Sequence, residues 1–276
     1  MIAKLERPVS ADGRVAQPTA SAGRVLQLDA VAKTYPTVGR GTIRAVDSVT
    51  AEFSAGEFVS ILGPSGCGKS TLMMMIAGLL LPSEGRIVHA VADGDENRFG
   101  IVFQDAILLP WRNVLGNVEL PGEVRKVSRS ARRQKALDMI ELVGLKGFED
   151  KFPNELSGGM QQRVAIARAL TLDPSLLLMD EPFGALDAMT RDQMNLELQR
   201  ISLQTGATVV FVTHSISEAA FLSDRVMVMT GRPSTVKEIV RIDIPRPRPI
   251  DLLSSDLLGR HISHIRAIFD EGAKHA

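Results

Sequence analysis

A glycine-rich segment that holds a lysine and a serine is the part of the sequence best suited to chemistry. Its residues are Gly63, Pro64, Ser65, Gly66, Cys67, Gly68, Lys69, Ser70 and Thr71, and they contain the pattern G-x-x-x-x-G-K-S in full. An apolar segment typical of a buried strand (57–62) precedes it, and an apolar, helix-like stretch (72–80) follows. Glycines let backbone N–H groups turn toward phosphate oxygens, and the positive end of a helix dipole adds to the attraction. We therefore predict a site for nucleotide phosphates, because a simple glycine turn would not explain the lysine and the hydroxyl.

Two side chains of this segment have separate roles in that prediction. Lys69 supplies a positive charge to the β- and γ-phosphates. The hydroxyl of Ser70 is the expected ligand of Mg²⁺, an ion that keeps most of its waters and takes one or two protein oxygens besides those of the phosphates. We expect Cys67 to pack as a small side chain and to offer only its backbone N–H.

An acidic pair follows the next uninterrupted apolar strand. Asp180 and Glu181 come directly after residues 176–179, which read L-L-L-M. We expect Asp180 to be a partner of the Mg²⁺ ion and Glu181 to polarise an attacking water molecule. A buried strand that ends in acids is common by itself, so the pair gains its meaning from the phosphate loop.

The composition excludes several classes of protein. The 276 residues are 45% hydrophobic and 23% charged, which is typical of a globular chain and excludes a disordered or collagen-like one. Thirty-two basic side chains balance 32 acidic ones, so no basic excess points to nucleic acid, although a local basic patch stays possible. The single cysteine cannot form an intrachain disulfide, which excludes a disulfide-stapled secreted protein and favours a reducing cytosol.

The apolar segments of the chain are too short for a membrane span. Residues 1–23 lack the apolar stretch of a secretory signal and are interrupted by proline and glycine, so we predict a flexible leader. The longest apolar run, 72–81, is broken by Gly78 and is well short of the roughly 20 residues that cross a bilayer. We expect that this chain does not span a membrane alone.

The elements that position these residues follow from hydrophobic periodicity. Alternation at 25–28 and 49–53 predicts short antiparallel strands ahead of the phosphate loop. Apolar strands at 176–179 and 208–212 end in polar residues, as in an open α/β sheet that binds its ligand at the carboxyl ends of its strands. The segment 128–143 predicts an amphipathic helix. From Pro245 onward, an Arg-Pro-Arg-Pro stretch predicts an extended linker, and Leu258, Ile262, Ile265 and Phe269 then recur at helical spacing.

Several motifs together resemble those of ABC-transporter ATPases. Residues 156–163, L-S-G-G-M-Q-Q-R, resemble the signature of that family, and Gln104, residues 184–187 (G-A-L-D) and His214 resemble its Q-loop, D-loop and switch histidine. The resemblance covers about residues 25–241. It implies an α/β fold: a P-loop NTPase core with a mostly parallel sheet, an N-terminal antiparallel β subdomain and an inserted helical subdomain. The expected division is a leader (1–23), an ABC ATPase domain (24–246, with helices inserted at about 106–160) and a C-terminal linker with an amphipathic helix (247–276).

The resemblance also implies roles for individual residues. Glu181, His214 and Gln104 are the expected catalytic residues, and Ser70, Gln104 and Asp180 are the expected residues around Mg²⁺. The residues expected to contact ATP, besides the phosphate loop, are Tyr35, Ser157, Gly158, Gly159, Gln161 and Asp187. Tyr35 would stack on adenine, with an edge-strand aromatic as the alternative. His214 would contact the γ-phosphate, with a purely structural histidine as the alternative.

A physical interpretation that does not depend on the resemblance also applies to Ser157, Gly158 and Gly159. They open a predicted helix whose free N–H groups form a second anion site, although the first loop already holds the phosphates of one nucleotide. A plain glycine turn before a helix is the alternative. In the family, two chains face each other head to tail, and these residues contact the γ-phosphate of the ATP that the partner's Lys69 loop holds.

The segment 108–114, L-L-P-W-R-N-V, resembles the nitrate/sulfonate/taurine importer subfamily. One cassette without a membrane span implies a homodimer bound to separate permease subunits at the cytoplasmic face of the inner membrane. A solute-binding protein would be an indirect partner, and nitrate, sulfonates, taurine, bicarbonate and pyrimidine precursors all stay open as solutes. We expect Trp111 on a partly exposed surface that receives a helix of the permease, with core packing as the alternative.

Two other functions are weaker on the same sequence. A soluble ABC ATPase of DNA repair or translation would resemble this chain in its motifs, but such proteins carry paired cassettes, zinc insertions or long coiled coils. A regulatory subunit without turnover is opposed by the presence of Glu181 and His214. His261 and His264 share a helical face, for which we expect a solvated tail and no metal site.

Overall fold

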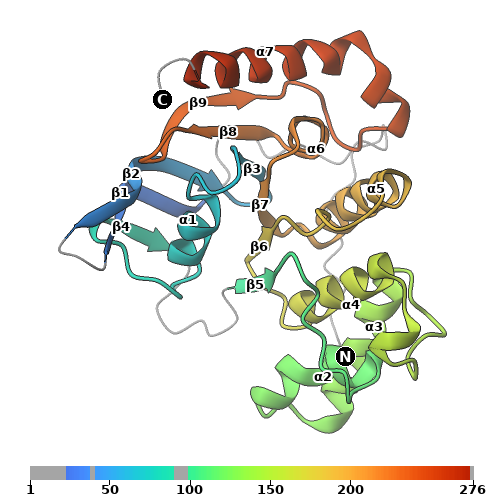
Figure 1. Cartoon of the computed structure of the whole chain (residues 1–276). Coiled ribbons are helices and arrows are strands. Elements are labelled where there is room, and N and C mark those ends of the chain that lie inside the picture. Colours follow the sequence, from blue (N-terminus) through green and yellow to red (C-terminus); the bar gives the residue numbers. More distant parts are fainter. Residues whose placement is uncertain (1–22, 38–40, 90–98, 274–276) are drawn as a thin grey trace.

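The computed structural model describes residues 23–37, 41–89 and 99–273. The predicted flexible leader (1–23) lies outside the described residues except for Gly23. Two sheets and a set of helices make up the fold (Figure 1). Among the helices of the described residues, none combines the length and the apolar character that a membrane span requires.

The larger sheet has six strands and places the phosphate loop at its centre. In spatial order they are β5 (Phe99–Val102), β6 (Leu176–Asp180), β7 (Thr208–Thr213), β3 (Phe58–Leu62), β8 (Arg225–Thr230) and β9 (Thr235–Arg241). All neighbouring pairs are parallel except β8 and β9, which form an antiparallel hairpin. The predicted α/β core with a mostly parallel sheet is therefore confirmed. Because β3, β6 and β7 are adjacent and parallel, the polar residues that follow them meet at one edge.

A three-stranded antiparallel sheet packs beside this core. Its order is β2 (Thr42–Ser54), β1 (Arg24–Pro36) and β4 (Glu84–His89), which confirms the predicted antiparallel strands before the phosphate loop. β1 and β2 are much longer than the alternating segments of the sequence. Their pairing contains several register shifts, two of them between Leu28 and Lys33. Each such irregularity interrupts the period-2 pattern, so alternation in the sequence reveals only part of each strand.

Three helices lie between β5 and β6 in the chain and form a group beside the sheet (Figure 1). They are α2 (Val114–Val124), α3 (Arg129–Leu142) and α4 (Gly158–Leu170), with a short 3₁₀ turn (Pro153–Glu155) before α4. The predicted amphipathic helix is confirmed by α3. The hydroxyl of Ser128 caps the start of this helix and accepts a hydrogen bond from the N–H of Ala131. The predicted limits of the inserted subdomain, 106–160, stay a prediction, and α4 itself continues to Leu170.

Four other helices pack on the core: α1 (Lys69–Ile76), α5 (Ala188–Thr205), α6 (Ile216–Leu222) and α7 (Asp256–Ala273). The sequence predicted an apolar helix through Leu80, but α1 ends at Ile76. Gly78 follows with a φ of +71°, a conformation that ends helices.

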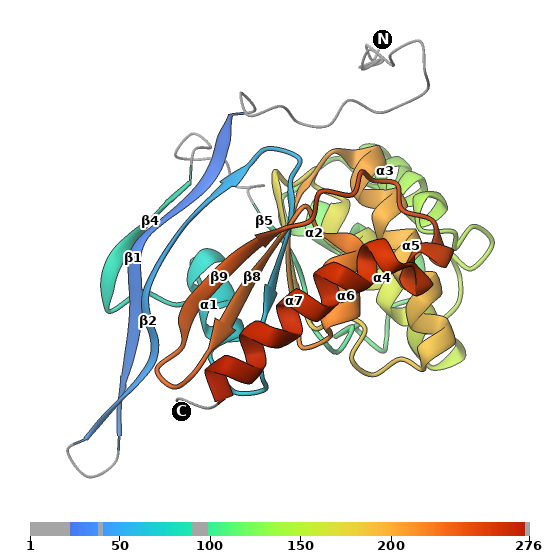
Figure 2. The ribbon, with the colours of Figure 1, turned by 90° about the horizontal axis from the view of Figure 1, so that it is seen from above.

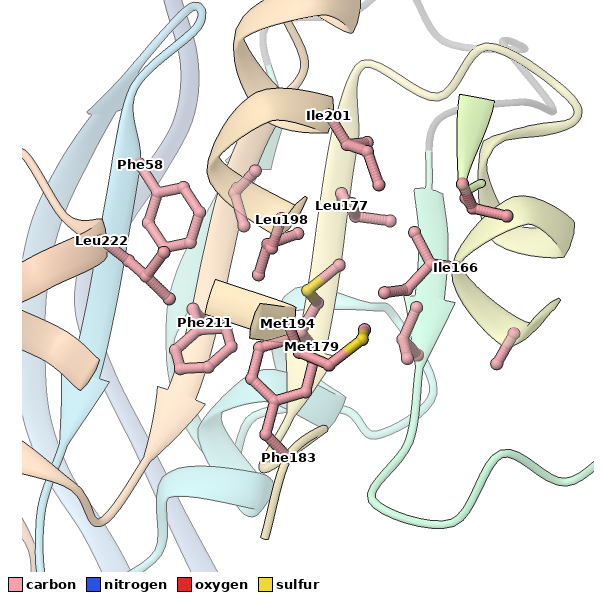
Figure 3. Close-up of a cluster of buried hydrophobic side chains, with 14 of the residues drawn as sticks. Phe58, Ile166, Leu177, Met179, Phe183, Met194, Leu198, Ile201, Phe211 and Leu222 are labelled. Carbon is pink, nitrogen blue, oxygen red and sulfur yellow. The ribbon is translucent and has the colours of Figure 1, made fainter. Parts of the chain in front are cut away.

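Apolar side chains bury both faces of the six-stranded sheet. Phe58, Met179 and Phe211 point toward the side covered by α4, α5 and α6, as Figure 3 shows. The residues that alternate with them, such as Ile61 and Val210, lie in a second cluster with α1 and the three-stranded sheet. Burial on both faces explains why these strands read as continuous apolar runs. Burial on both faces also fixes the positions of the strand ends, which carry the residues of the candidate site.

The tail after Pro245 is packed against the core, a contact that the prediction of an extended linker did not include. Arg248 is only 1% exposed, and its guanidinium donates to the carbonyl oxygens of Ala220 (2.8 Å), Phe221 (2.8 Å) and Ser223 (3.0 Å) at the end of α6. The proline-rich composition indicated only an extended chain, whereas hydrogen bonds to these carbonyl oxygens hold the tail on the core. The predicted tail helix is confirmed by α7, which lies along β8 and β9 (Figure 2) and buries Leu258 and Ile265.

Candidate functional site

The phosphate loop joins β3 to α1 and has a backbone shape that its glycines make possible. A Cβ on Gly63 would lie 2.7 Å from the Sγ of Cys67 and 2.8 Å from the carbonyl oxygen of Met229. Gly66 and Gly68 have φ values of +72° and +112°, which other residues rarely adopt. The Cys67 side chain is buried, as expected of a packing residue. The loop can therefore turn its N–H groups inward at the start of α1.

Lys69 lies under this loop and is 4% exposed. Its Nζ donates to the carbonyl oxygens of Gly63 (2.9 Å) and Pro64 (3.1 Å), and it lies 3.4 Å from Oε1 of Glu181. The lysine on α1 is thus brought to the acid that follows β6. A buried cation in this position can form charge-assisted hydrogen bonds with phosphate oxygens.

Ser70 and Asp180 supply two oxygens that fit a magnesium ion. The Ser70 Oγ donates to Oδ1 of Asp180 at 3.0 Å. Burial raises the pKa of the Asp180 carboxyl, and the hydrogen bond from Ser70 partly offsets this effect. A hydroxyl and a carboxylate are hard oxygen ligands, and Mg²⁺ needs only one or two of them from protein when phosphate is present. The sequence predicted both residues at the magnesium ion, and that role stays a prediction.

Glu181 lies between two partners at the end of β6. Its Oε1 faces Lys69, and its Oε2 is 2.8 Å from Nδ1 of His214, which follows β7. Its own backbone has a φ of +45°, and its N–H donates to the carbonyl oxygen of Val212 at 2.9 Å. A positive φ at a residue with a side chain costs free energy and persists only where the surrounding contacts fix it. The carboxylate is therefore held in one direction at the edge of the sheet.

Gln104 follows β5 and lies at the junction between the sheet and the helices. Its Nε2 is 3.5 Å from the position that a Cβ would take on Gly184, which follows Glu181 in the chain. The backbone on either side is tied to α4. Gln162 donates to the carbonyl oxygen of Phe103 at 3.0 Å, and Arg168 donates to those of Ala106 and Ile107, both at 2.8 Å.

Sequence reasoning missed Gln162 and Arg168 as supports of the Gln104 segment. Gln162 belongs to the Q-Q-R part of the signature, so that motif gave a signal for it. Arg168 carried no signal, because its partners are backbone carbonyls 62 and 61 positions away.

Ser157 begins α4 on the outer surface of the molecule. Its hydroxyl accepts the N–H of Met160 at 3.3 Å, and of the described residues it bonds none in the phosphate loop. The Nε2 of Gln161 donates to the carbonyl oxygens of Pro153 (2.9 Å) and Leu156 (3.3 Å), which fixes the entry to the helix. Ser157 and Gly158 are exposed, whereas Gly159 is buried against Thr190. This helix terminus is therefore open to another molecule.

Asp187 begins α5 next to the start of α4. Its carboxylate accepts the N–H of Thr190 at 3.0 Å, and this bond lowers its pKa. A Cβ on Gly158 would lie 3.6 Å from Leu186. The structure thus joins the signature segment to the segment 184–187, but it does not bring either to Lys69 through a hydrogen bond of the described residues.

Two aromatic residues predicted to act at surfaces are exposed. Tyr35 is 36% exposed near the end of β1, with the Nζ of Lys33 5.4 Å from its ring centroid. Its contact with adenine stays a prediction. Trp111 is 71% exposed, so the prediction of an exposed tryptophan is confirmed and the alternative of core packing is wrong.

A glycine loop between a strand and a helix, a buried lysine, a Ser–Asp pair and a glutamate held by a histidine define a P-loop ATPase. Comparison with known proteins gives the family. Residues 46–184 match the model of the ABC transporter family. The taurine import ATP-binding protein TauB of Yersinia pestis is 47% identical over 196 residues, which are 70% of this chain and 77% of TauB.

Two further similarities agree with this match. The nitrate import ATP-binding protein NrtC of Synechococcus elongatus is 45% identical over 229 residues, 81% of this chain but 35% of NrtC, so this chain spans about a third of that relative. A dimeric ATP-binding cassette solved in a post-hydrolysis state with ADP and phosphate superimposes with a TM-score of 0.67 at 36% identity, covering 80% of this chain and all of the other. The chain belongs to the ABC transporter family. It is a cassette that binds and hydrolyses ATP, and the DNA-repair or translation alternative is not favoured.

Proposed function

We propose that this chain energises the import of a small solute, as two copies bound to separate membrane subunits at the cytoplasmic face of the membrane. The observation that carries the proposal is the meeting of Lys69, Glu181 and His214 at one sheet edge, with Glu181 3.4 Å and 2.8 Å from the other two. That arrangement is suited to hydrolysis. The similarity to proteins named for nitrate and taurine import supports the direction of transport and the solute class.

The phosphate loop binds the nucleotide in this proposal. Its N–H groups and Lys69 hold the phosphates of ATP, and Tyr35 stacks on the adenine. Ser70 and Asp180 would hold Mg²⁺, with Gln104 as a further contact from the neighbouring segment. When bound, the ion neutralises charge on the β- and γ-phosphate oxygens.

Glu181 acts on the attacking water. The carboxylate orients the water and accepts its proton as the oxygen bonds to the γ-phosphorus and the bond to the β–γ bridging oxygen breaks. His214 holds one carboxylate oxygen through Nδ1. Its Nε2 is left to face the γ-phosphate, to which it donates in the imidazolium form, in which both ring nitrogens carry a proton. The pair therefore positions the base and adds a donor where negative charge develops.

A second chain completes each site. Ser157, Gly158, Gly159, Gln161 and Asp187 lie at or beside two helix starts, and Ser157, Gly158 and Asp187 among them are exposed. These residues would face the nucleotide held by the partner's phosphate loop. The dimeric form of a similar cassette, bound to ADP and phosphate, supports this arrangement.

Uptake in the source organism tests the proposed import. We would delete the gene, restore either the wild type or Lys69→Ala, and follow labelled nitrate, sulfonate, taurine, bicarbonate and a pyrimidine precursor. Deletion should abolish uptake of one of these solutes, and only the wild type should restore it. Unchanged uptake of all five would contradict the proposal. The solute that is lost would identify the class of solute-binding protein that serves the system.

A further inference from the structure

The turn between β8 and β9 lies against the phosphate loop, and its arginine has no role in the site described above. Ser234, at the end of this turn, is fixed to β2: its N–H donates to the carbonyl oxygen of Ala45 (3.1 Å), and the N–H of Asp47 donates to the carbonyl oxygen of Ser234 (2.8 Å). A Cβ on Gly68 would lie 2.9 Å from the Ala45 oxygen and 3.5 Å from the Cβ of Ser234. The turn, β2 and the phosphate loop therefore touch one another.

Arg232 extends from this turn onto the middle of the loop. Its Nη2 lies 2.5 Å from the position that a Cβ would take on Gly66, so the guanidinium occupies the space beside that glycine. Only a residue without a Cβ leaves this space open. The arginine and the loop thus fit each other, since Gly66 also has the positive φ that glycine adopts.

The charge of Arg232 is available to a ligand. The residue is exposed, and within the described part of the chain no carboxylate lies at ion-pair distance from it. Lys69, by contrast, already faces Glu181 at 3.4 Å. A guanidinium offers a planar fork of donors that matches phosphate oxygens, and it keeps its charge at all relevant pH values.

The same surface leads to the proposed adenine site. Tyr35 on β1 pairs with Ile43 on β2, and β2 continues to Val46, which bridges to Ser234. A nucleotide that runs from Tyr35 to the phosphate loop would pass along this wall. Arg232 lies at the end of the wall that borders the loop.

We infer that Arg232 is a second cation for the nucleotide phosphates and contacts oxygens of the β-phosphate. This inference rests on the proposed nucleotide site. Backbone N–H groups of such a loop surround the α- and β-phosphates while the lysine reaches the β- and γ-phosphates, and Gly66 lies midway along the loop. The contact is formed within one chain and does not need the dimer.

Calorimetric titration of the purified full chain with ADP, ATP and AMP tests the inference. Arg232→Ala should weaken ADP and ATP binding by the same factor, about 10-fold for the loss of a charge-assisted contact at an exposed site. AMP, which lacks the β-phosphate, should bind the variant and the wild type alike. Arg232→Lys should recover part of the loss, because it keeps the charge but not the fork. Arg241→Ala removes an exposed arginine at the far end of the same hairpin and should bind all three nucleotides as the wild type does.

Other outcomes would overturn the inference. Equal ADP affinity of Arg232→Ala and the wild type would show that the arginine does not contact the β-phosphate. A lower melting temperature of the nucleotide-free Arg232→Ala protein, with unchanged ADP affinity, would show that the residue only holds the hairpin. A wild type that fails to bind ADP at all would instead refute the proposed nucleotide site itself, so the two failures can be told apart.

Discussion

Glu181 shows how the chain fixes one carboxylate among many. Its two oxygens are shared between Lys69 and His214, and its backbone is held at a φ of +45° by the bond to Val212. The cost of that conformation is of the order of 1–3 kcal/mol, so neighbouring strands must stabilise it. The result is an acid whose direction depends on the register of β6 and β7 rather than on a flexible side chain.

Removal of Lys69 should reduce ATP affinity. Lys69→Ala deletes a buried cation that we propose to face the phosphates, and we expect ATP binding to weaken by about 2 kcal/mol, or about 30-fold. Calorimetry measures this affinity directly. Lys151→Ala removes an exposed lysine paired with Glu155 and serves as the control that should not change binding. Equal ATP affinity of Lys69→Ala and the wild type would contradict the role given to the loop.

Most candidate site residues could be predicted because each stands in a contiguous motif. Lys69 and Ser70 follow one predicted strand, and Asp180 and Glu181 come at the end of another. Because the carboxyl ends of parallel strands meet at one edge of a sheet, the sequence already predicted that these residues lie close together. The contacts between motifs could not be predicted. The 2.8 Å contact of Glu181 with His214 requires that β6 and β7 be neighbours in a given register, which no local pattern encodes.

At the scale of elements, irregularities explain where sequence patterns failed. The register shifts in β1 and β2 hid most of both strands, because alternation changes phase at each shift. The packing of the tail after Pro245 was missed for another reason. Its packing depends on Arg248. Burial lowers the pKa of this guanidinium to about 10. Hydrogen bonds to carbonyl oxygens of α6, which is distant in sequence, offset the cost of burying the charge.

Arg248 should therefore contribute much to stability. Arg248→Ala leaves the carbonyl oxygens of Ala220, Phe221 and Ser223 without this donor, and we expect a loss of about 3 kcal/mol in the free energy of unfolding. Urea denaturation of the purified chain gives the value. Arg241→Ala, an exposed arginine, should change stability by less than about 0.5 kcal/mol. A similar small change for Arg248→Ala would mean that the tail is only loosely held.

The segment around Trp111 should serve binding rather than stability. Trp111 is 71% exposed, so Trp111→Ala should leave the melting temperature and the ATPase rate of the isolated chain nearly unchanged. In cells it should reduce uptake of the solute and copurification with the permease. Leu81→Ala truncates an equally exposed apolar residue after α1 and is the matched control. Normal uptake with Trp111→Ala would exclude this residue from the docking surface.

At the scale of the whole molecule, the proposed function gives one chain two halves of different sites. The phosphate loop and Glu181 form one half, and the exposed start of α4 forms the other. Neither the hydrogen bonds of Ser157 nor those of Asp187 connect to the loop within the described chain. Two chains that face each other head to tail would join the halves.

A cation at the start of α4 should separate binding from turnover. Ser157→Arg places bulk and positive charge where N–H groups face the partner's nucleotide, so each chain should bind ATP nearly as the wild type does while hydrolysis and ATP-dependent dimer formation are lost. Ser128→Arg, at the corresponding capping position of α3, is the control for loss of a helix cap. Equal loss of ATP binding and turnover in Ser157→Arg would show that Ser157 serves its own chain's nucleotide.

ATP turnover by Glu181→Gln tests the central claim most directly. The substitution keeps the size of the side chain but removes the charge that orients and deprotonates water, so phosphate release should fall by about 100-fold or more while ATP still binds. Gel filtration with ATP should then show a stable dimer. Glu52→Gln, an exposed glutamate on β2, removes the same charge elsewhere and should behave as the wild type. Phosphate release by Glu181→Gln near the wild-type rate would contradict the assignment of this residue and of the site built around it.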